Sequence, residues 1–290
     1  MKYLTLIILA LFLAVPGLRA ALIVEDFFAT NLSGGTGLDG SWSGSDQSFT
    51  ASGLTYSDAV SGNSLGSAGA VTASEDRTAM ERSLTTGASA STAETAGGNE
   101  IWIAWLGSGS SDVSMQYSIF FEPGATSTST ESSLILSGAF GGGIDIQQRE
   151  ELPAPDGRTN TSFAQNVGNT STDGSANLFV GQFNFQIGAN DTFRLWVNPT
   201  LEPTGPGDTG LSDYGDSGVQ NLTADLESIL GFNNRPQNGD RNDYSYTFDE
   251  FRIGTSYAQV IAIPEPTTFS LLALLFGCAL MGHRRRRSQA

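Results

Sequence analysis

Three aspartates that lie close together in the chain are the first candidates for chemistry. Asp208, Asp213 and Asp216 fall within a glycine-containing stretch of nine residues. Hard cations such as Ca²⁺ prefer several oxygen ligands on flexible loops. The spacing does not match an EF-hand, and the same residue types are common in acidic turns. Calcium is therefore a candidate cofactor at these three aspartates, and a solvated turn is the alternative.

Paired carboxylates are the next candidates, because glycoside hydrolysis needs two carboxyl groups about 5–10 Å apart. Asp249 and Glu250 are adjacent in a strand-like run, so we expect their side chains on opposite faces. Glu150 and Glu151 precede a Leu-Pro pair and are typical of a solvated loop. Neither pair predicts a hydrolytic site.

Histidine and cysteine are confined to the C-terminal end of the chain. His283 is the sole histidine and Cys278 the sole cysteine. Residues 21–262 therefore exclude a Ser-His-Asp triad, a Cys-His pair, a disulfide and any His-ligated zinc or iron. We expect no catalytic residue there and predict that the protein is not an enzyme.

Four tryptophans could contact sugar rings if they were exposed. They are Trp42, Trp102, Trp105 and Trp196. Tryptophan in a β-sandwich is more often part of the core. Trp102 and Trp105 have opposite parity along one strand-like run, so one of them should face away from the core. Trp196 should face away from Phe193 and its apolar neighbours.

The charge distribution separates the two ends from the rest of the chain. The chain has 14 basic and 30 acidic residues. Without the two ends, 8 basic and 29 acidic residues remain, which is a formal charge of −21. A surface of this kind repels nucleic acid, because phosphate binding needs a cationic footprint. We therefore exclude nucleic acid as a partner.

Residues 21–262 contain short strand-like runs separated by Gly, Ser, Asn and Asp. Many short strands with turn residues between them predict an all-β jelly-roll sandwich. Low-complexity stretches at 61–98 and 124–132 are typical of long loops, and Leu222–Leu230 suggests a helix. The predicted strands are Leu22–Phe28, Ile101–Leu106, Val113–Phe121, Ser133–Ile146, Asn177–Ile187, Asp191–Val197 and Tyr244–Ile253.

The N-terminal end has the pattern of a secretory signal peptide. Lys2 precedes an apolar run from Leu4 to Val15, which Pro16 and Gly17 interrupt. The run is too short to span a bilayer comfortably. We predict cleavage after Ala20, so that residues 1–20 form the signal peptide.

The C-terminal end combines three features in a fixed order. Pro264, Glu265 and Pro266 come first, and an apolar run from Phe269 to Gly282 follows. The run predicts a short transmembrane helix, which the prolines prevent from extending backwards. The positive-inside effect keeps a cluster of four arginines in the cytoplasm and so leaves residues 21–262 outside. These arginines are Arg284, Arg285, Arg286 and Arg287.

This tail resembles the PEP-CTERM sorting signal of Gram-negative bacteria, over the last 28 residues (263–290). The resemblance implies that an exosortase-type membrane transpeptidase is a partner and that it cleaves near Pro264–Pro266. The chain would be anchored transiently in the membrane by its C-terminal helix. It would then be delivered to the cell surface or the extracellular matrix, often together with exopolysaccharide.

Residues 21–262 resemble the concanavalin A-like lectin/glucanase superfamily in its laminin-G-like form. The resemblance lies in Leu178–Phe185, Asn190–Pro199 and Phe248–Gly254, and in Glu25-Asp26-Phe27, whose strand should pair near the C-terminal one. Calcium is common in laminin-G-like domains. The Glu-x-Asp-x-x-Glu string of the glucanase branch is absent, which favours a protein without hydrolase activity.

Together these features predict an exported, non-catalytic protein of the cell surface or matrix, associated with exopolysaccharide and able to bind carbohydrate. Two alternatives stay open: an envelope-localised glycan-active enzyme with a different carboxylate site, and a purely structural matrix protein. The fold alone does not decide among them.

Overall fold

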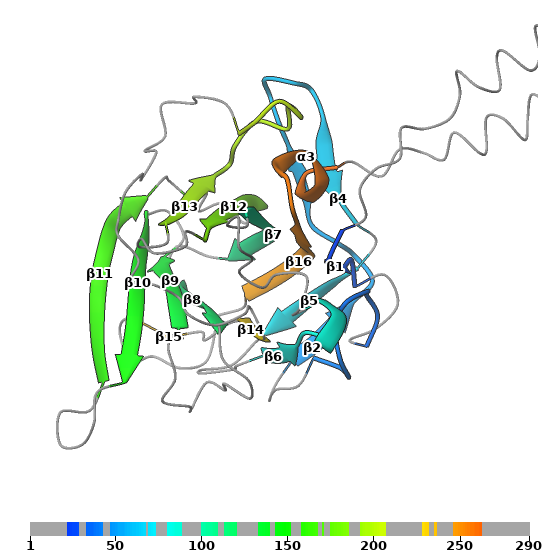
Figure 1. Cartoon of the computed structure of the whole chain (residues 1–290). Coiled ribbons are helices and arrows are strands. Elements are labelled where there is room, and N and C mark those ends of the chain that lie inside the picture. The colour runs from blue at the N-terminus through cyan, green and yellow to red at the C-terminus, as the bar shows by residue number, and fades with distance from the viewer. Residues whose placement is uncertain are drawn as a thin grey trace, which may run out of the picture.

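The computed structural model describes part of the chain, and within that part the protein is all-β with antiparallel strands (Figure 1). Among the described residues, the longest element that is not a strand is a single helical turn, α3 (Tyr257–Val260). The described residues are 22–28, 33–42, 47–67, 69–73, 80–88, 100–109, 113–120, 133–139, 143–151, 158–167, 170, 175–185, 192–206, 228–231, 235–236 and 246–262.

The first sheet has seven strands and contains both the first and the last strand of the described chain. Its order is β13-β12-β7-β16-β5-β2, and β1 also pairs with β16. The strands are β13 (Thr192–Val197), β12 (Asn177–Asn184), β7 (Glu100–Gly109), β16 (Tyr246–Gly254), β5 (Ala70–Ala73), β2 (Gln47–Thr50) and β1 (Val24–Asp26).

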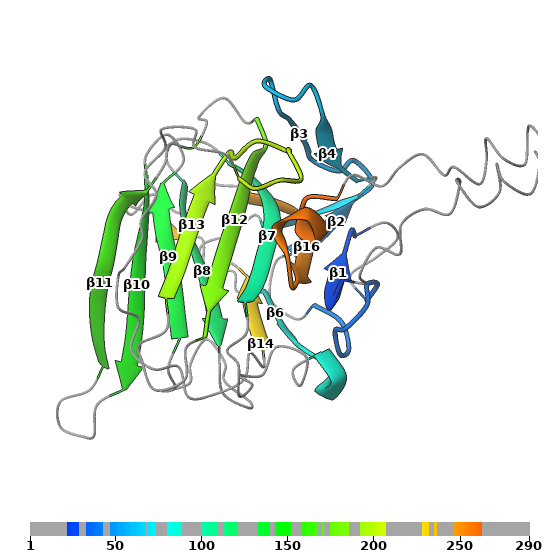
Figure 2. The ribbon, with the colours of Figure 1, turned by 45° about the horizontal axis from the view of Figure 1, so that its top comes forward.

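The second sheet also has seven strands, in the order β11-β10-β9-β8-β14-β6, with β15 paired to β8. Figure 2 shows β11, β10, β9 and β8 following one another across the left of the molecule. The strands are β11 (Arg158–Val167), β10 (Ile144–Glu151), β9 (Ser133–Ala139), β8 (Val113–Phe120), β14 (Ser228–Gly231), β6 (Met80–Ser83) and β15 (Arg235–Pro236).

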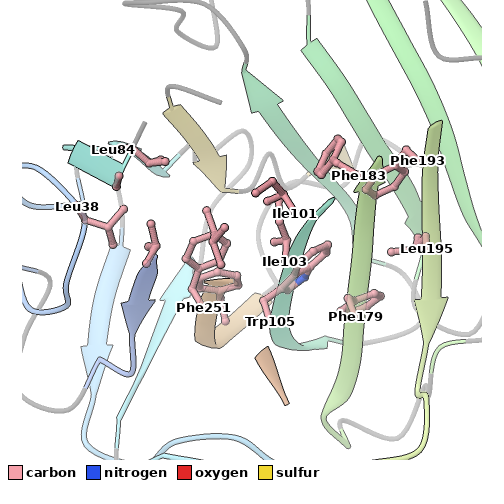
Figure 3. Packing of buried hydrophobic residues seen from close by; sticks show 14 of the residues in the cluster. Leu38, Leu84, Ile101, Ile103, Trp105, Phe179, Phe183, Phe193, Leu195 and Phe251 are labelled. Atoms are coloured by element: carbon pink, nitrogen blue, oxygen red, sulfur yellow. The ribbon is translucent and has the colours of Figure 1, made fainter. Parts of the chain in front are cut away.

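The main core covers one face of the first sheet and reaches Ile144 of the second sheet. Its members on β7, β12 and β13 all have one parity along their strand, as the period of two in a strand requires. Figure 3 shows several of these side chains packed together. They include Ile101, Ile103, Trp105, Phe179, Phe183, Phe193 and Leu195.

A second apolar cluster lies on the opposite face of the first sheet. It contains Ala104, Leu106 and Val180 from the sheet and Val260 from α3. A two-stranded hairpin, β3 (Thr55–Ser57) with β4 (Ser64–Gly66), contributes Leu65 to the same cluster. The first sheet is therefore buried on both faces.

Several predictions from the sequence are confirmed. Each predicted strand run contains a strand, and Val24–Asp26 pairs with β16 through Val24 opposite Ile253, as the resemblance implied. β12 and β13 pair as a hairpin. Within the described residues no helix is long and apolar enough to cross a membrane.

Other predictions are wrong. The stretch 61–98 is not one loop, because β4, β5 and β6 lie in it. Ser133–Ile146 is two strands, β9 and β10, rather than one. Ser228–Gly231, in the part predicted to be a helix, is strand β14, because it pairs with β8 and β6 and this tertiary pairing outweighs local propensity.

Candidate functional site

The face of the second sheet that lies opposite Ile144 carries the candidate site. Ile144 is buried in the core and pairs with Gly138, which pairs with Met115. Residues opposite each other in an antiparallel pair share a face, and the face alternates along each strand. Asp145, and every second residue after it on β10, therefore lies on the face away from the core.

The register arranges polar residues of four strands on this face. Arg149 stands between Asn160 of β11 and Ser133 of β9, and Ser133 stands opposite Phe120 of β8. The next row is Ser162, Gln147, Ile135 and Ser118, and the third is Asp145, Ser137 and Gln116. We call these three rows the polar face.

Strand β6, at the end of the same sheet, gives an independent check on this assignment. Ser228 pairs with both Phe120 and Ser83, so Ser83 extends the first row of the polar face. Ser83 is exposed, whereas the side chain of its neighbour Arg82 is 2% exposed. The alternation deduced from Ile144 therefore holds at both ends of the sheet.

The spacing of the polar face suits an extended ligand. Neighbouring strands are about 4.8 Å apart, and residues on one face of a strand recur about every 7 Å. The three rows offer one guanidinium, three amides, four hydroxyls and one carboxylate, together with the apolar Phe120 and Ile135.

The tryptophans do not contribute an exposed stacking surface. Trp102 and Trp196 lie on the face of the first sheet away from the main core, as predicted, but their rings stack on each other with centroids 5.4 Å apart. They are 6% and 8% exposed, and Trp42 and Trp105 are 2% exposed. The idea that these rings hold a sugar is wrong, because protein side chains already cover them.

Asp249 is a buried carboxyl that joins the β3–β4 hairpin to the first sheet. Its Oδ2 accepts a hydrogen bond from the Leu54 amide at 2.8 Å, and its Oδ1 accepts one from Ser67 Oγ at 2.7 Å. Burial raises the pKa of Asp249 to about 7, against the lowering effect of the Ser67 hydrogen bond, and the charge of Glu250 adds to the rise. One carboxyl thus holds both ends of the hairpin.

Asp58 holds the tip of the same hairpin. Its Oδ2 accepts a hydrogen bond from the Leu201 amide at 2.8 Å, and its Oδ1 accepts one from the Val60 amide at 2.9 Å. Burial alone would raise the pKa of Asp58, but hydrogen bonds from Ser61 and these amides outweigh it and lower the pKa to about 2. The hairpin is therefore fastened at its base and at its tip.

Glu250 and Arg252 form a buried ion pair next to Asp249, with Arg252 Nη2 donating to Glu250 Oε2 at 2.5 Å. The pairing of β16 with β7 shifts between Asp249 and Arg252, and Glu250 has a φ of 54°. Burial raises the pKa of Glu250, and Arg252 opposes that rise. The opposite-face prediction for Asp249 and Glu250 fails, because this bulge breaks the alternation and directs Glu250 to Arg252.

Asp26 and Arg82 form a second buried ion pair, with Arg82 Nη1 and Asp26 Oδ2 2.7 Å apart. Trp42 Nε1 donates to the same oxygen at 2.8 Å. Arg82 also donates to the backbone oxygens of Gly34 and Gly40. Burial raises the pKa of Asp26. This pair ties the segment 33–42 to both sheets and is closed to a ligand.

The candidate residues from the sequence fall into two groups: those that the structure describes and those that lie outside the described residues. Asp249 and Glu250 are buried structural groups, and Glu150 and Glu151 belong to strand β10 rather than to a loop. Among the residues that the structure describes, no three His, Cys, Asp or Glu side chains gather as a metal site. The proposed calcium ligands Asp208, Asp213 and Asp216, the motif Pro264–Pro266 and the segment from Phe269 to Arg287 lie outside the described residues.

Sequence reasoning missed the polar face altogether. Strand β11, with the sequence RTNTSFAQNV, is so polar that it does not stand out as a strand. Its signal was the alternation of Arg158, Asn160 and Ser162 with threonines, next to the Gln-Gln-Arg run of β10. That pattern is typical of a strand with one face in water.

Comparisons with known proteins give structural likeness only. No protein-family model matches the chain, and no curated protein matches it. An endo-β-1,4-glucuronan lyase from the fungus Trichoderma reesei is similar, with a TM-score of 0.48, 14% identity, and 79% of this chain and 95% of that chain covered.

Two further solved structures are similar to a lower degree. For the alginate lyase vAL-1 from Chlorella virus the TM-score is 0.41 and the identity 12%, covering 74% of this chain and 93% of that chain. For the binding domain of botulinum neurotoxin serotype D/C the TM-score is 0.38 and the identity 10%, covering 74% of this chain and 44% of that chain. Function has to be argued from the residues of this chain.

Proposed function

We propose that this chain is an exported protein of the cell surface or extracellular matrix that binds polysaccharide without cleaving it. The proposal that the protein binds polysaccharide is supported by the register of the strands in the second sheet. This register places Arg149 and Gln147 of β10, Asn160 of β11 and Gln116 of β8 at positions on one face of the sheet. Amide and guanidinium groups are the donors that recognise hydroxyl and carboxylate oxygens.

The arrangement of the buried carboxyls supports the non-catalytic part of the proposal. Asp26, Asp249 and Glu250 are each at most 1% exposed and bonded to protein donors. A raised pKa such as that of Asp249 is a common feature of a general acid. The raised pKa of Asp249 comes from its burial beneath the β3–β4 hairpin, where a glycosidic oxygen cannot reach the carboxyl group.

The two ends of the chain support the localisation. Residues 1–20 have the pattern of a signal peptide, and residues 263–290 that of a PEP-CTERM sorting signal. The described chain ends at Ala262, whose backbone oxygen accepts a hydrogen bond from Arg252 at 2.5 Å. In this proposal an exosortase-type enzyme of a Gram-negative host recognises the segment that follows. The C-terminal helix holds the chain in the membrane until then.

The experiment that tests the binding function is a titration of the full-length protein with the exopolysaccharide of the bacterium that produces it. We call this polymer the host exopolysaccharide. We expect saturable binding that weakens about 10-fold when Gln147 is replaced by alanine, because the variant has no amide at this position to hydrogen-bond the polysaccharide. The matched control is Gln182→Ala, since Gln182 lies on the first sheet, opposite Trp102 and Arg194.

The outcomes separate the three functions. Binding that Gln147→Ala weakens and Gln182→Ala does not supports the proposal. Unchanged affinity in both variants would remove the polar face as the site. Absence of binding would favour a purely structural matrix protein, and release of shorter sugar chains would favour an enzyme.

A further inference from the structure

The β3–β4 hairpin is attached to the first sheet without a strand ladder. It forms a two-stranded sheet of its own, and in the described part of the chain neither of its strands pairs with a strand of the two large sheets. Figure 2 shows the hairpin projecting at the top of the molecule. It can therefore separate from the first sheet without breaking a strand pair in either large sheet.

Asp249 of β16 binds the hairpin at the two points where it meets the sheet. Leu54, directly before β3, and Ser67, directly after β4, donate to different oxygens of this carboxyl at 2.8 and 2.7 Å. Asp249 is 0% exposed. The fit is close at Gly53, where an added Cβ would lie 2.9 Å from Asp249 Oδ2. The closed hairpin thus leaves no room for a methyl group beside the carboxyl.

The hydroxyl of Ser67 has two acceptors within reach. Its Oγ lies 2.7 Å from Asp249 Oδ1 and 2.8 Å from the backbone oxygen of Gly69. A serine hydroxyl has one proton and can donate it to one acceptor at a time. An ionised carboxyl is the stronger acceptor, so it draws the hydroxyl away from Gly69. The hydrogen bonds at the base of the hairpin therefore depend on the charge of Asp249.

The charged neighbours of Asp249 on β16 and β1 do not supply it with a cation of its own. Glu250 raises the pKa of Asp249 through its charge, and Arg252 is bound to Glu250. On β1, Glu25 acts on Glu250, and Asp26 has its own buried ion pair. An ionised Asp249 under the closed hairpin is therefore held by hydrogen bonds alone.

The other elements around Asp249 carry no group that changes its charge near neutral pH. On β7 the position opposite Asp249 is Leu106, and β5 has no titratable residue. In the hairpin, burial alone would raise the pKa of Asp58, but its hydrogen bonds lower it to about 2. Burial raises the pKa of Tyr56 to about 12 and also raises the pKa of Tyr257 in α3.

Opening of the hairpin would return water to the Asp249 carboxyl. Burial is the main reason why its pKa is raised from 3.8 to about 7 in the closed form, so this pKa falls towards its ordinary value when the hairpin opens. A group with a lower pKa in the open form favours opening as the pH rises. The stabilisation of the closed form is complete below about pH 4 and is lost as the pH rises through about 7.

We propose that the β3–β4 hairpin is a proton-controlled strap, which lies on the first sheet while Asp249 is protonated and detaches from it once Asp249 is ionised. Opening uncovers an apolar surface, because Leu65 of the hairpin is 0% exposed and packs with Leu106 and Leu178. The bonds of the hairpin tip to the segment 199–201 limit how far the strap moves. This inference does not depend on the proposed glycan binding.

Hydrogen–deuterium exchange of the full-length protein between pH 5 and 8 tests the strap. Rates are expressed as protection factors, which removes the effect of pH on exchange itself. We expect the amides of residues 54–67 to be less protected than those of β12 and β13, because they exchange through local opening. Their protection should fall at least 10-fold from pH 5 to pH 7, since one unit of pKa difference between the closed and open forms is a factor of ten.

Three variants assign the effect to Asp249. Asp249→Asn should abolish the fall in protection. Ser67→Ala should extend the fall to higher pH, because the hydrogen bond that it removes lowers the pKa of Asp249 in the wild type. Asp58→Asn is the matched control: it removes a buried carboxyl at the tip that stays ionised throughout this range. It should lower the protection of the hairpin equally at every pH and keep the fall.

Two results would overturn the proposal. Equal protection of residues 54–67 and of β12 and β13 at every pH would mean that the hairpin opens only when the whole protein unfolds. A fall that persists in Asp249→Asn would assign the pH dependence to another group, with Glu250 the first candidate. If Asp249→Asn does not fold, Ser67→Ala decides, because an unshifted pH range in that variant also contradicts the strap.

Discussion

Arg149 of β10 and Asn160 of β11 stand directly opposite each other in the second sheet. Opposed residues on one face of an antiparallel pair have Cβ atoms about 5 Å apart. The pairing of β10 with β11 places an arginine and an asparagine at opposed register positions. The proposed glycan site depends on it.

Replacing Asn160 by aspartate should weaken glycan binding more than replacing it by alanine. A carboxylate opposite Arg149 would pair with the guanidinium and compete with the ligand. We expect about a 10-fold loss of affinity in Asn160→Asp, with Asn160→Ala between that variant and the wild type. A titration with host exopolysaccharide checks this. Equal affinities for the two variants would contradict the role of Arg149.

The same asparagine-to-aspartate change at a position outside the proposed site is the control. It measures the effect of the added negative charge alone. Asn184 is exposed on β12 of the first sheet. Asn184→Asp adds the same negative charge to the protein without placing it opposite Arg149. Its affinity should match that of the wild type.

Asp249 should make the stability of the protein fall as the pH rises through neutrality. Its pKa is raised from 3.8 to about 7 in the folded protein, because burial disfavours the charged form. The stabilisation by its proton is fully present below about pH 4 and is lost as the pH rises through about 7. The free energy of unfolding should change by on the order of 3 kcal/mol over this range. Urea midpoints measured from pH 4 to 8 would show it.

Asp249→Asn cannot titrate and should have a flatter pH profile between pH 4 and 8. Ser67→Ala is the control, because it removes a donor to Asp249 without removing the titrating group. It should keep the slope of the wild type and extend it to higher pH, because the hydrogen bond that it removes lowers the pKa of Asp249 in the wild type. An unchanged slope in Asp249→Asn would show that another group is responsible.

Breaking the Glu250–Arg252 pair from one side should destabilise the fold strongly. Arg252→Met leaves the Glu250 carboxyl buried without its cation, which costs about 3–5 kcal/mol in comparable pairs. The double variant with Glu250→Gln should be less destabilised than the sum of the two single changes. Urea unfolding of the four proteins completes the cycle. Strict additivity would mean that the two side chains do not depend on each other.

Replacing Pro264, Glu265 and Pro266 by alanines should leave export intact and trap the full-length chain in the inner membrane. The prolines keep this segment extended and separate from the following helix, so that a membrane enzyme could reach its backbone. A mass measurement on protein released from the cell surface checks the wild type. If the released protein still carries His283 and the four arginines, the tail is a stable anchor and the sorting proposal is wrong.

The apolar strands could be predicted from the sequence because their periodicity is local. Phe193, Leu195 and Val197 alternate with polar residues, and the structure places all three in the main core. The same parity correctly separated Trp196 from that core. The exposure of the Trp196 ring could not be predicted from the sequence. Trp102 covers this ring only after segments that are distant in the chain have packed together.

The polar face could not be predicted because it depends on register between strands. Ser133 and Arg149 share a row, and so do Ser228 and Ser83, although 145 positions separate the last two in the chain. Strand β11 lacks the apolar alternation that identifies a half-buried strand. The bulge at Glu250 was equally hidden, since no Gly or Pro marks it in the sequence.

Hydrogen–deuterium exchange of the full-length protein, with and without host exopolysaccharide, tests the central claim most directly. If the polar face is the glycan site, bound polysaccharide should slow amide exchange in β9, β10 and β11, over Ser133–Ala139, Ile144–Glu151 and Arg158–Val167. Exchange in β12 and β13 of the first sheet should stay unchanged. Protection confined to β12 and β13, or to residues 207–227, would contradict the account.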